Sequence, residues 1–214
     1  NKYYESYVRS HSSNVLYNIK IILIKNPKKD NCIELGASIY HKFSKNSSSN
    51  INFVFSNYLL KSNNNPCSEI IFGLMLRSYN FNKYKNNNKN FIVNSINLII
   101  TKNYKLKKMQ YFNHLLFAIN YTKDLVSEPA NVLNPVSYSK LCEKLKIPGL
   151  KVKVLDLSEI KSIGMKALLA VSQGSINQPR VVVFEWNLKK NIKPTILVGK
   201  GVTFDTGGIS LKPS

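Results

Sequence analysis

The sequence has little of several features that would assign a protein to a class at once. Only 11 of its 214 residues are acidic, which leaves a net charge of +20, yet only 3 of its 31 basic residues are arginine. Phosphate recognition usually depends on the planar arginine guanidinium, which binds a phosphate through two hydrogen bonds. The small number of arginines therefore argues against a dedicated nucleic-acid site. The 28 lysines occur together with 28 asparagines, a composition typical of an AT-rich genome. We therefore interpret the charge as a solvated basic surface.

Cysteine, histidine and long apolar runs are also scarce. The three cysteines, Cys32, Cys67 and Cys142, are an odd number without C-x-x-C spacing. This argues against a disulfide framework or a zinc knuckle and predicts reduced thiols in the cytosol. The three histidines are scattered, so no histidine-based metal or catalytic site is expected. No apolar run approaches the ~20 residues that cross a bilayer.

The chain does have enough apolar residues to fold. At 43% hydrophobic, its 214 residues can bury a core, and the length fits one large domain or one and a half smaller ones. It begins at Asn1 rather than at a methionine and ends at Ser214 inside a motif. We therefore expect a piece of a longer protein, from which a leader segment could have been lost.

The first half of the chain is predicted to consist of strands separated by polar inserts. Alternating apolar residues over 15–24 indicate a strand with one strongly apolar face. Three further apolar runs are interpreted in the same way: Ile51–Phe55, Ile70–Leu76 and Phe91–Ile100. Three segments rich in asparagine and serine are predicted to be surface loops: 44–50, 61–66 and 82–90.

Helical periodicity begins near residue 108. Apolar residues from Met109 to Val126 recur at helical spacing, and the Glu128–Pro129 pair is expected to end the helix. A long helix after a strand-rich block is a natural connector between two domains. We place an amino-terminal α/β domain at 1–108, a linker helix at 109–128 and the start of a second domain at 129–214.

After Pro135, helices and strands alternate, which is how an α/β domain begins. Ser137 is expected to cap a helix that ends by Pro148–Gly149, and a short helix is expected over 157–164. Strands are predicted over three segments: 152–155, 181–186 and 195–198.

The segment that carries chemistry is Gly199–Ser214, GKGVTFDTGGISLKPS, which directly follows the last predicted strand. The carboxyl ends of such strands commonly build active sites. The glycine spacing fits neither the phosphate loop GxxxxGK[ST] nor the dinucleotide fingerprint GxGxxG. From the pattern alone, Asp205 is either a hydrogen-bonded turn residue or a metal ligand, and Lys200 and Lys212 are either surface charges or functional groups.

Gly199–Ser214 closely resembles the active-site signature of the leucine (cytosol) aminopeptidase family, which are two-metal exopeptidases. The resemblance continues upstream. Asp124–Pro135, DLVSEPANVLNP, resembles the segment at the entrance to the family's catalytic domain, and Ser158–Arg180 resembles the helix, strand and turn that follow. Gly73–Lys85 resembles a segment of the family's amino-terminal domain.

This resemblance implies two α/β domains, the second carrying a di-metal centre with Zn²⁺ or Mn²⁺. Lys200 stands at the position of the family's metal-ligand lysine, and Asp205 at that of the aspartate that bridges both ions. Lys212 stands at that of the lysine that holds and polarises the substrate carbonyl. The remaining ligands and a catalytic arginine would lie beyond Ser214, so these 214 residues alone are expected to be inactive.

The implied chemistry suits these residue types. Two divalent ions about 3.5–4 Å apart activate a water and hold the substrate amine and carbonyl. Asp205 offers hard oxygen ligands. Lys200 would bind metal only as the neutral amine, whereas Lys212 would stay charged to stabilise the oxyanion. The resemblance implies a cytoplasmic enzyme, a homohexamer when complete, that removes leucine-like, hydrophobic amino-terminal residues from peptides, with no membrane partner.

Two alternatives from other classes stay open. The basic amino-terminal domain could bind nucleic acid, which a steep salt dependence of binding would indicate. It could also serve purely in hexamer assembly, which native mass spectrometry of residues 1–113 would address. The asparagine- and lysine-rich composition is compatible with an apicomplexan parasite as the source.

Overall fold

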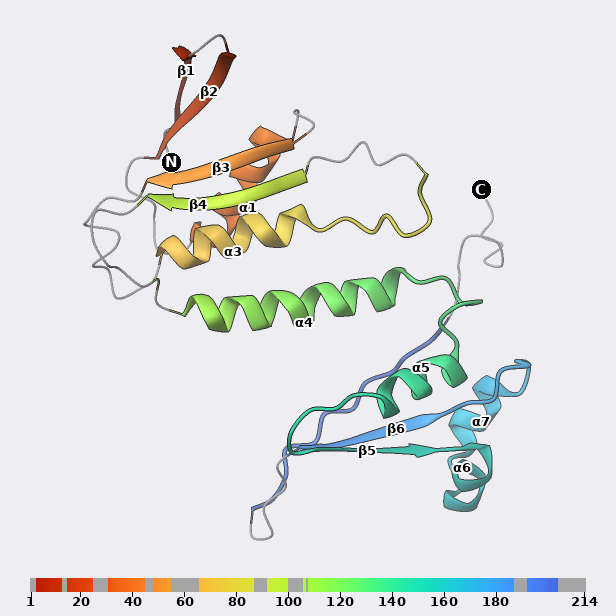
Figure 1. Ribbon diagram of the computed structural model, residues 1–214. Helices are drawn as coiled ribbons and strands as arrows, with labels where there is room; N and C mark the ends of the chain where they lie inside the picture. Colours follow the sequence, from red (N-terminus) through yellow and green to blue (C-terminus); the bar gives the residue numbers. More distant parts are fainter. Residues whose placement is uncertain are drawn as a thin grey trace. The chain divides into compact units, whose positions relative to one another are not determined.

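The computed structural model is a mixed α/β protein, as the sequence predicts, with six helices and six strands among the residues it describes (Figure 1). For residues 3–12, 15–24 and a few other strand positions, only the backbone is described. The described residues are 3–12, 15–24, 31–44, 48–54, 66–86, 92–99, 106, 108–186 and 192–203.

Internal contacts divide the chain into two compact units, residues 1–124 and residues 125–214. We call them unit 1 and unit 2 and describe each separately. The functional domain limits placed at 108 and 128 stay a prediction.

Unit 1 begins with a hairpin. β1 (Tyr3–Ser12) pairs antiparallel with β2 (Val15–Ile24) in an unbroken register that runs from Tyr3↔Ile24 to Ser12↔Val15. The strand predicted over 15–24 is confirmed. Its partner β1 was not anticipated.

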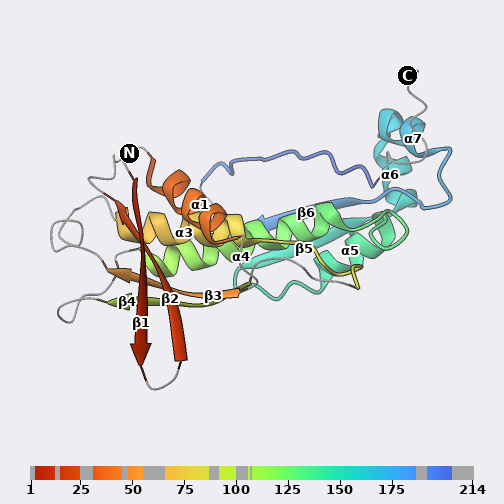
Figure 2. The same ribbon diagram turned by 90° about the horizontal axis from the view of Figure 1, so that it is seen from above.

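A second pair of strands carries the core of unit 1. β3 (Ser48–Val54) and β4 (Ile92–Ile99) run parallel, with one irregularity after Ser49. Helices α1 (Cys32–Phe43) and α3 (Pro66–Ser78) lie on one face of this pair (Figure 2). The strands predicted at 51–55 and 91–100 are confirmed within the described residues. The surface loop predicted over 44–50 is wrong for 48–50, which begin β3.

The two faces of the β3–β4 pair differ in chemistry. Ile51 and Phe53 are buried in the cluster formed with the two helices. On the outer face the Asn97 side-chain amide donates to Asn52 Oδ1 (2.8 Å), and the Ser95 hydroxyl donates to Asn50 Oδ1 (3.1 Å). These polar pairs suit a face that meets water.

The strand predicted at Ile70–Leu76 is wrong, because this run lies inside helix α3. Five consecutive residues from Ile70 to Leu74 are buried, so α3 is apolar nearly all round. Such a helix shows no amphipathic period, and a short apolar run then cannot be told from a buried strand. Helix α1 was not predicted at all, and the interpretation of the first half as strands alone is wrong.

Two glycines let α1 and α3 cross in backbone contact. A Cβ added to Gly36 would overlap the carbonyl oxygen of Ile70, and a Cβ added to Gly73 would overlap that of Ile33. Each helix therefore presents a glycine to the main chain of the other. A side chain at either position would have to push the two helices apart.

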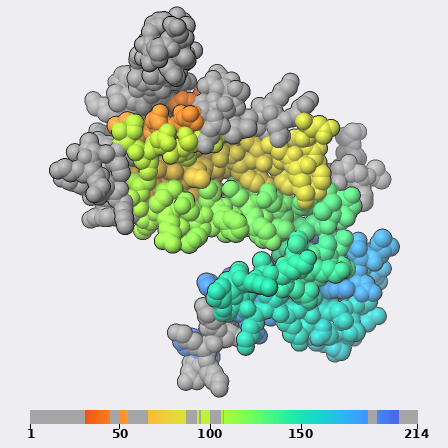
Figure 3. Space-filling model, in the orientation of Figure 1, coloured from red at the N-terminus to blue at the C-terminus, as the bar shows by residue number. Residues whose placement is uncertain are grey.

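Helix α4 (Met109–Ser127) packs along α3 and confirms the long helix predicted over 109–126 (Figure 3). Phe112 stacks on Phe72 with ring centroids 4.8 Å apart, and Leu116 is buried in the same cluster. Of the predicted loop 82–90, residues 82–86 form turns, while 87–90 lie outside the described residues, as do 61–65. Pro66 already belongs to α3.

Unit 2 alternates helices and strands. Its antiparallel strands β5 (Leu150–Leu155) and β6 (Val181–Trp186) confirm the strands predicted at 152–155 and 181–186, and α6 (Leu157–Ile163) confirms the predicted short helix. The strand implied by the resemblance within 158–180 is instead helix α7 (Lys166–Ser172).

Helix α5 spans Pro135–Glu143, and its N-cap lies three residues before the predicted cap, Ser137. Its cap is Asn134, whose Oδ1 accepts from the backbone amides of Val136 (3.1 Å) and Ser137 (2.9 Å). In the opposite direction, the Ser137 hydroxyl oxygen accepts a hydrogen bond from the Asn134 backbone amide at 2.9 Å. Pro135 fits the first helical position, where no amide donor is needed. Ser137 is therefore the second half of a capping box.

Helix α6 has a matching start. Asp156 caps it by accepting from the amides of Ser158 and Glu159, both at 2.9 Å. Gly164 ends it with φ of 80°, a conformation in which glycine carries no steric penalty. Across the described ranges no helix has the length and apolar character needed to cross a membrane.

Candidate functional site

Of the three residues predicted to carry chemistry, the structure describes one. Lys200 lies in the stretch 192–203, which has neither helix nor strand, and its side chain is exposed. Asp205 and Lys212 lie outside the described residues. The roles of the three residues therefore stay predictions.

The strand predicted at 195–198 is wrong. This stretch pairs with no strand among the described residues, and Leu197 and Val198 are more than 90% exposed. A lone extended segment has no neighbour to satisfy its backbone amides and carbonyls, so its apolar side chains do not by themselves make it a strand.

The described residues do not assemble a metal centre. No three histidine, cysteine, aspartate or glutamate side chains converge within the described ranges. Lys200 alone is not a sufficient donor set, since a metal site needs several ligands held in fixed geometry.

Cys32, Cys67 and Cys142 are buried thiols that are not joined in disulfides, as the sequence predicts. Burial raises the pKa of Cys67 to about 11 and also raises the pKa of Cys142. Because the thiolate is the form that attacks electrophiles and binds metals, these two cysteines are structural rather than catalytic.

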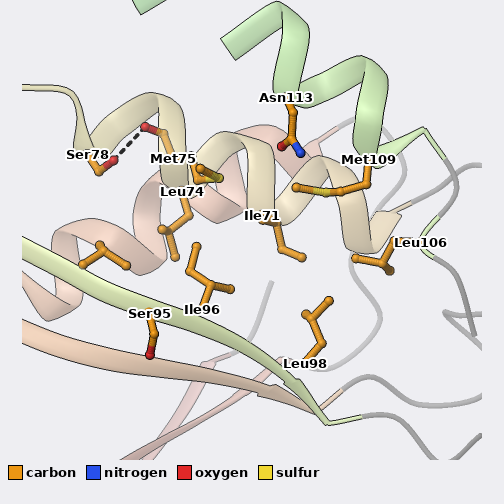
Figure 4. A pocket seen from close by; sticks show the side chains of 11 residues that line it. Ile71, Leu74, Met75, Ser78, Ser95, Ile96, Leu98, Leu106, Met109 and Asn113 are labelled. Carbon is orange, nitrogen blue, oxygen red and sulfur yellow. Dashed lines mark hydrogen bonds between the residues drawn. The ribbon is translucent and has the colours of Figure 1, made fainter. Parts of the chain in front are cut away.

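A hollow of about 390 Å³ lies in unit 1 between α3, β4 and the start of α4 (Figure 4). Ile71, Leu74 and Met75 of α3 face Ile96 and Leu98 of β4 across it. None of its described lining residues is titratable, so it offers no acid, base or charged group for catalysis.

A second hollow, of about 490 Å³, lies in unit 2 beside α6 and α7. Lys161 and Lys166 line it together with serine and glutamine side chains, and no carboxylate is among its described lining residues. Neither hollow contains a residue that the sequence predicts to be functional.

The segment Asp124–Pro135, singled out by its resemblance, is held by hydrogen bonds within it and by hydrogen bonds to residues outside it. The Pro129 carbonyl accepts from the amides of Val132 and Leu133, both at 2.9 Å. The Ser137 hydroxyl donates to the Val132 carbonyl, also at 2.9 Å. At the start of the segment, Asp124 accepts a hydrogen bond from Tyr79, 45 residues away, a pairing that no local sequence pattern reveals.

The sequence profile of the cytosol aminopeptidase family, catalytic domain, matches residues 120–214. Two proteins described as probable cytosol aminopeptidases align with the chain. The one from Brucella ovis is 40% identical over 154 residues, which are 69% of this chain and 31% of the relative. The one from Phytoplasma australiense is 43% identical over 149 residues, 66% of this chain and 29% of the relative.

The chain belongs to the leucine (cytosol) aminopeptidase family. It spans about a third of the length of these curated relatives. The profile match contains Lys200, Asp205 and Lys212, so all three lie in the part of this family member that aligns with the catalytic domain.

Two solved structures share the fold. A mutant of tomato leucine aminopeptidase superposes with a TM-score of 0.70 at 22% identity, over 95% of this chain and 42% of that one. The bottromycin maturation enzyme BotP in complex with Mn superposes with a TM-score of 0.66 at 20% identity, over 99% of this chain and 45% of that one. The leucine aminopeptidase fold thus extends over both units of this family member.

Proposed function

We propose that the protein to which these 214 residues belong is a metal-dependent aminopeptidase that releases leucine-like, hydrophobic amino-terminal residues from peptides in the cytoplasm. The observation that carries this proposal is the match of residues 120–214 to the family's catalytic domain. Relatives described as cytosol aminopeptidases support both the reaction class and the compartment.

We assign three residues of the matched segment to the site. Asp205 and Lys200 would hold a pair of divalent ions, which when bound supply Lewis acidity and a reactive water. The two donors suit such ions, since a carboxylate offers hard oxygen ligands and an uncharged amine offers nitrogen. Zn²⁺ and Mn²⁺ are the candidates, and the structurally similar BotP is in complex with Mn.

Lys212 is given a different role. Its ammonium would face the substrate carbonyl and stabilise the negative charge that develops on the oxygen in the transition state. It would have to keep its proton for this purpose, whereas Lys200 would have to lose its proton to bind metal.

Alanine variants of the complete protein separate these roles. Asp205→Ala should lose metal and activity together, because in this proposal both ions would depend on this ligand. Lys200→Ala should weaken one site, so that excess metal restores part of the activity. Lys212→Ala should keep its metal while kcat falls about 10²–10³-fold, as for loss of one oxyanion donor.

The measurements are metal stoichiometry and turnover of a leucine-amide substrate with added Mn²⁺ or Zn²⁺. Lys193→Ala is the matched control, because Lys193 is an exposed lysine in the same described stretch as Lys200. If Lys212→Ala removed the metal, or if Asp205→Ala kept both ions, the role assignments would be wrong. An inactive, metal-free complete protein would contradict the proposed function itself.

We also propose that the complete protein is a homohexamer, as the family resemblance implies. Nucleic-acid binding is the less favoured alternative, supported by the net charge of +20. Native mass spectrometry of the complete protein and the salt dependence of its binding to duplex DNA test the two statements separately.

A further inference from the structure

Helices α3 and α4 run side by side in the same direction, so their carboxyl ends lie together (Figure 1, Figure 2). Their apolar contact is confined to the first part of α4, where Phe112 and Leu116 are buried and Ile119 packs beside them. Beyond Ile119, α4 buries no apolar side chain, and Val126 is 81% exposed. The last two turns of α4 therefore need another source of stability, because an unsupported helix end frays.

Polar contacts take over where the apolar contact ends. The ammonium of Lys123 donates to the Leu76 carbonyl at 3.3 Å, which satisfies one of the carbonyls left without a partner at the end of α3. The same ammonium lies 4.9 Å from the centre of the Tyr79 ring, a cation–π contact. The Tyr79 hydroxyl in turn donates to Asp124 Oδ1 at 2.8 Å.

These contacts join residues that are 45 to 47 positions apart in the sequence. The positive charge of Lys123 is placed at the negative end of the α3 dipole, which favours it. The hydrogen bond from Tyr79 reaches a carboxylate, and such charge-assisted bonds are stronger than neutral ones. Asp124 is also the last residue of unit 1.

We propose that Tyr79, Lys123 and Asp124 form a latch that holds the end of α4 on α3. The latch lies at the carboxyl end of unit 1, so α4 is held on α3 as far as Asp124. This assigns a role to the first residue of the Asp124–Pro135 segment that is independent of the proposed peptidase activity.

Hydrogen exchange of the 214-residue chain tests the latch. Tyr79→Phe removes one hydroxyl and keeps the ring beneath Lys123. We expect the amides of residues 124–127 to exchange about five- to tenfold faster, as for the loss of one solvent-exposed hydrogen bond in a locally opening segment. Amides near Phe112 and Leu116 should keep their protection, because the apolar contact is unchanged.

Tyr121→Phe is the matched control, since it removes a hydroxyl from another tyrosine at the end of α4, one that is 38% exposed and whose ring stacks with Phe117. It should leave both regions as they are. Asp124→Ala should reproduce the effect of Tyr79→Phe, and the double variant should add little, because both changes remove the same bond. Asp124→Asn keeps an acceptor oxygen and should restore part of the protection.

Two outcomes would overturn the latch. The first is unchanged exchange at 124–127 in Tyr79→Phe. The second is an equal acceleration at 124–127 and near Leu116, which would mean that Tyr79 contributes only to the general stability of unit 1.

Discussion

The two units bury their apolar residues to very different extents. Among the described residues, thirteen of the sixteen buried hydrophobic side chains belong to unit 1, and three belong to unit 2: Cys142, Leu155 and Ile160. The most exposed apolar side chains all lie in unit 2, with Ile176 at 98% and Leu197 and Val198 above 90%. The unit that lies within the catalytic-domain match is thus the one with the thinner described core. A sequence segment can therefore match a family's catalytic domain while burying few apolar side chains among its described residues.

The largest effect is expected where unit 1 is packed most tightly. Gly73→Ala places a methyl group against the main chain of α1 at Ile33, where no side chain can rotate away. Overpacking typically costs about 1–3 kcal/mol, and a clash with backbone belongs at the upper end or beyond. We expect the helical circular-dichroism signal to melt at much lower denaturant. The single tryptophan, Trp186 of unit 2, should keep its own transition.

Gly174→Ala provides the comparison for this variant. Its added methyl group meets nothing within 4 Å, so the helical transition should stay within about 0.5 kcal/mol of the parent, as for an ordinary surface change. A Gly73→Ala chain as stable as the parent would show that α1 and α3 are not held in backbone contact.

The next largest effect is expected in unit 2, where two isoleucine substitutions test whether the few buried residues form a cooperative core. Ile160 of α6 is completely buried, whereas Ile163 of the same helix is 58% exposed. Ile160→Ala should destabilise unit 2 by about 2–4 kcal/mol, and Ile163→Ala by well under half of that. The unfolding transition followed by Trp186 fluorescence measures both. Equal effects of the two variants would mean that unit 2 is held by secondary structure alone.

The sequence predicts elements well where a period and a boundary signal agree. Helix α4 shows an apolar period that stops before Pro129. Strand β5 alternates apolar residues with lysine, and strand β6 opens with three valines. It misassigns α3 because burial on all sides removes the period. It places the start of α5 at Ser137 rather than Asn134 because both residue types cap helices, and only the reciprocal bonds tell which one does.

The site is less accessible to sequence reasoning than the fold. Asp205, Lys200 and Lys212 were identified through the resemblance of a continuous motif, since glycine spacing alone left a turn or surface role open for each. A two-metal centre is assembled from segments far apart in a chain, and no local period reports which of them meet. The hydrogen bond between Tyr79 and Asp124 is equally hidden from local sequence patterns. Tyr79 follows the end of α3, whereas Asp124 lies near the end of α4.

The smallest effect concerns the charge at the start of α6. Hydrogen bonds from the Glu159 amide and the Ser158 hydroxyl lower the pKa of Asp156 in the folded chain. A folded pKa below the unfolded value stabilises the fold above the ordinary aspartate pKa of about 4, and this contribution is lost as the pH falls through the folded pKa. Unit 2 should therefore lose a small part of its thermal stability on acidification, as followed by Trp186 fluorescence.

Asp156→Asn isolates this charge, because the asparagine oxygen still accepts from the Ser158 and Glu159 amides but does not titrate in this range. The parent should melt at a higher temperature than Asp156→Asn near neutral pH, and the difference should shrink below about pH 4. Asp156→Ala should melt lower than both near neutral pH, since it loses the cap as well as the charge. If the difference between the parent and Asp156→Asn did not change with pH, α6 would depend on the cap oxygen and not on its charge. The small core of unit 2 makes it the better place for this measurement, because a weak contribution at a helix start is then a larger share of the total stability.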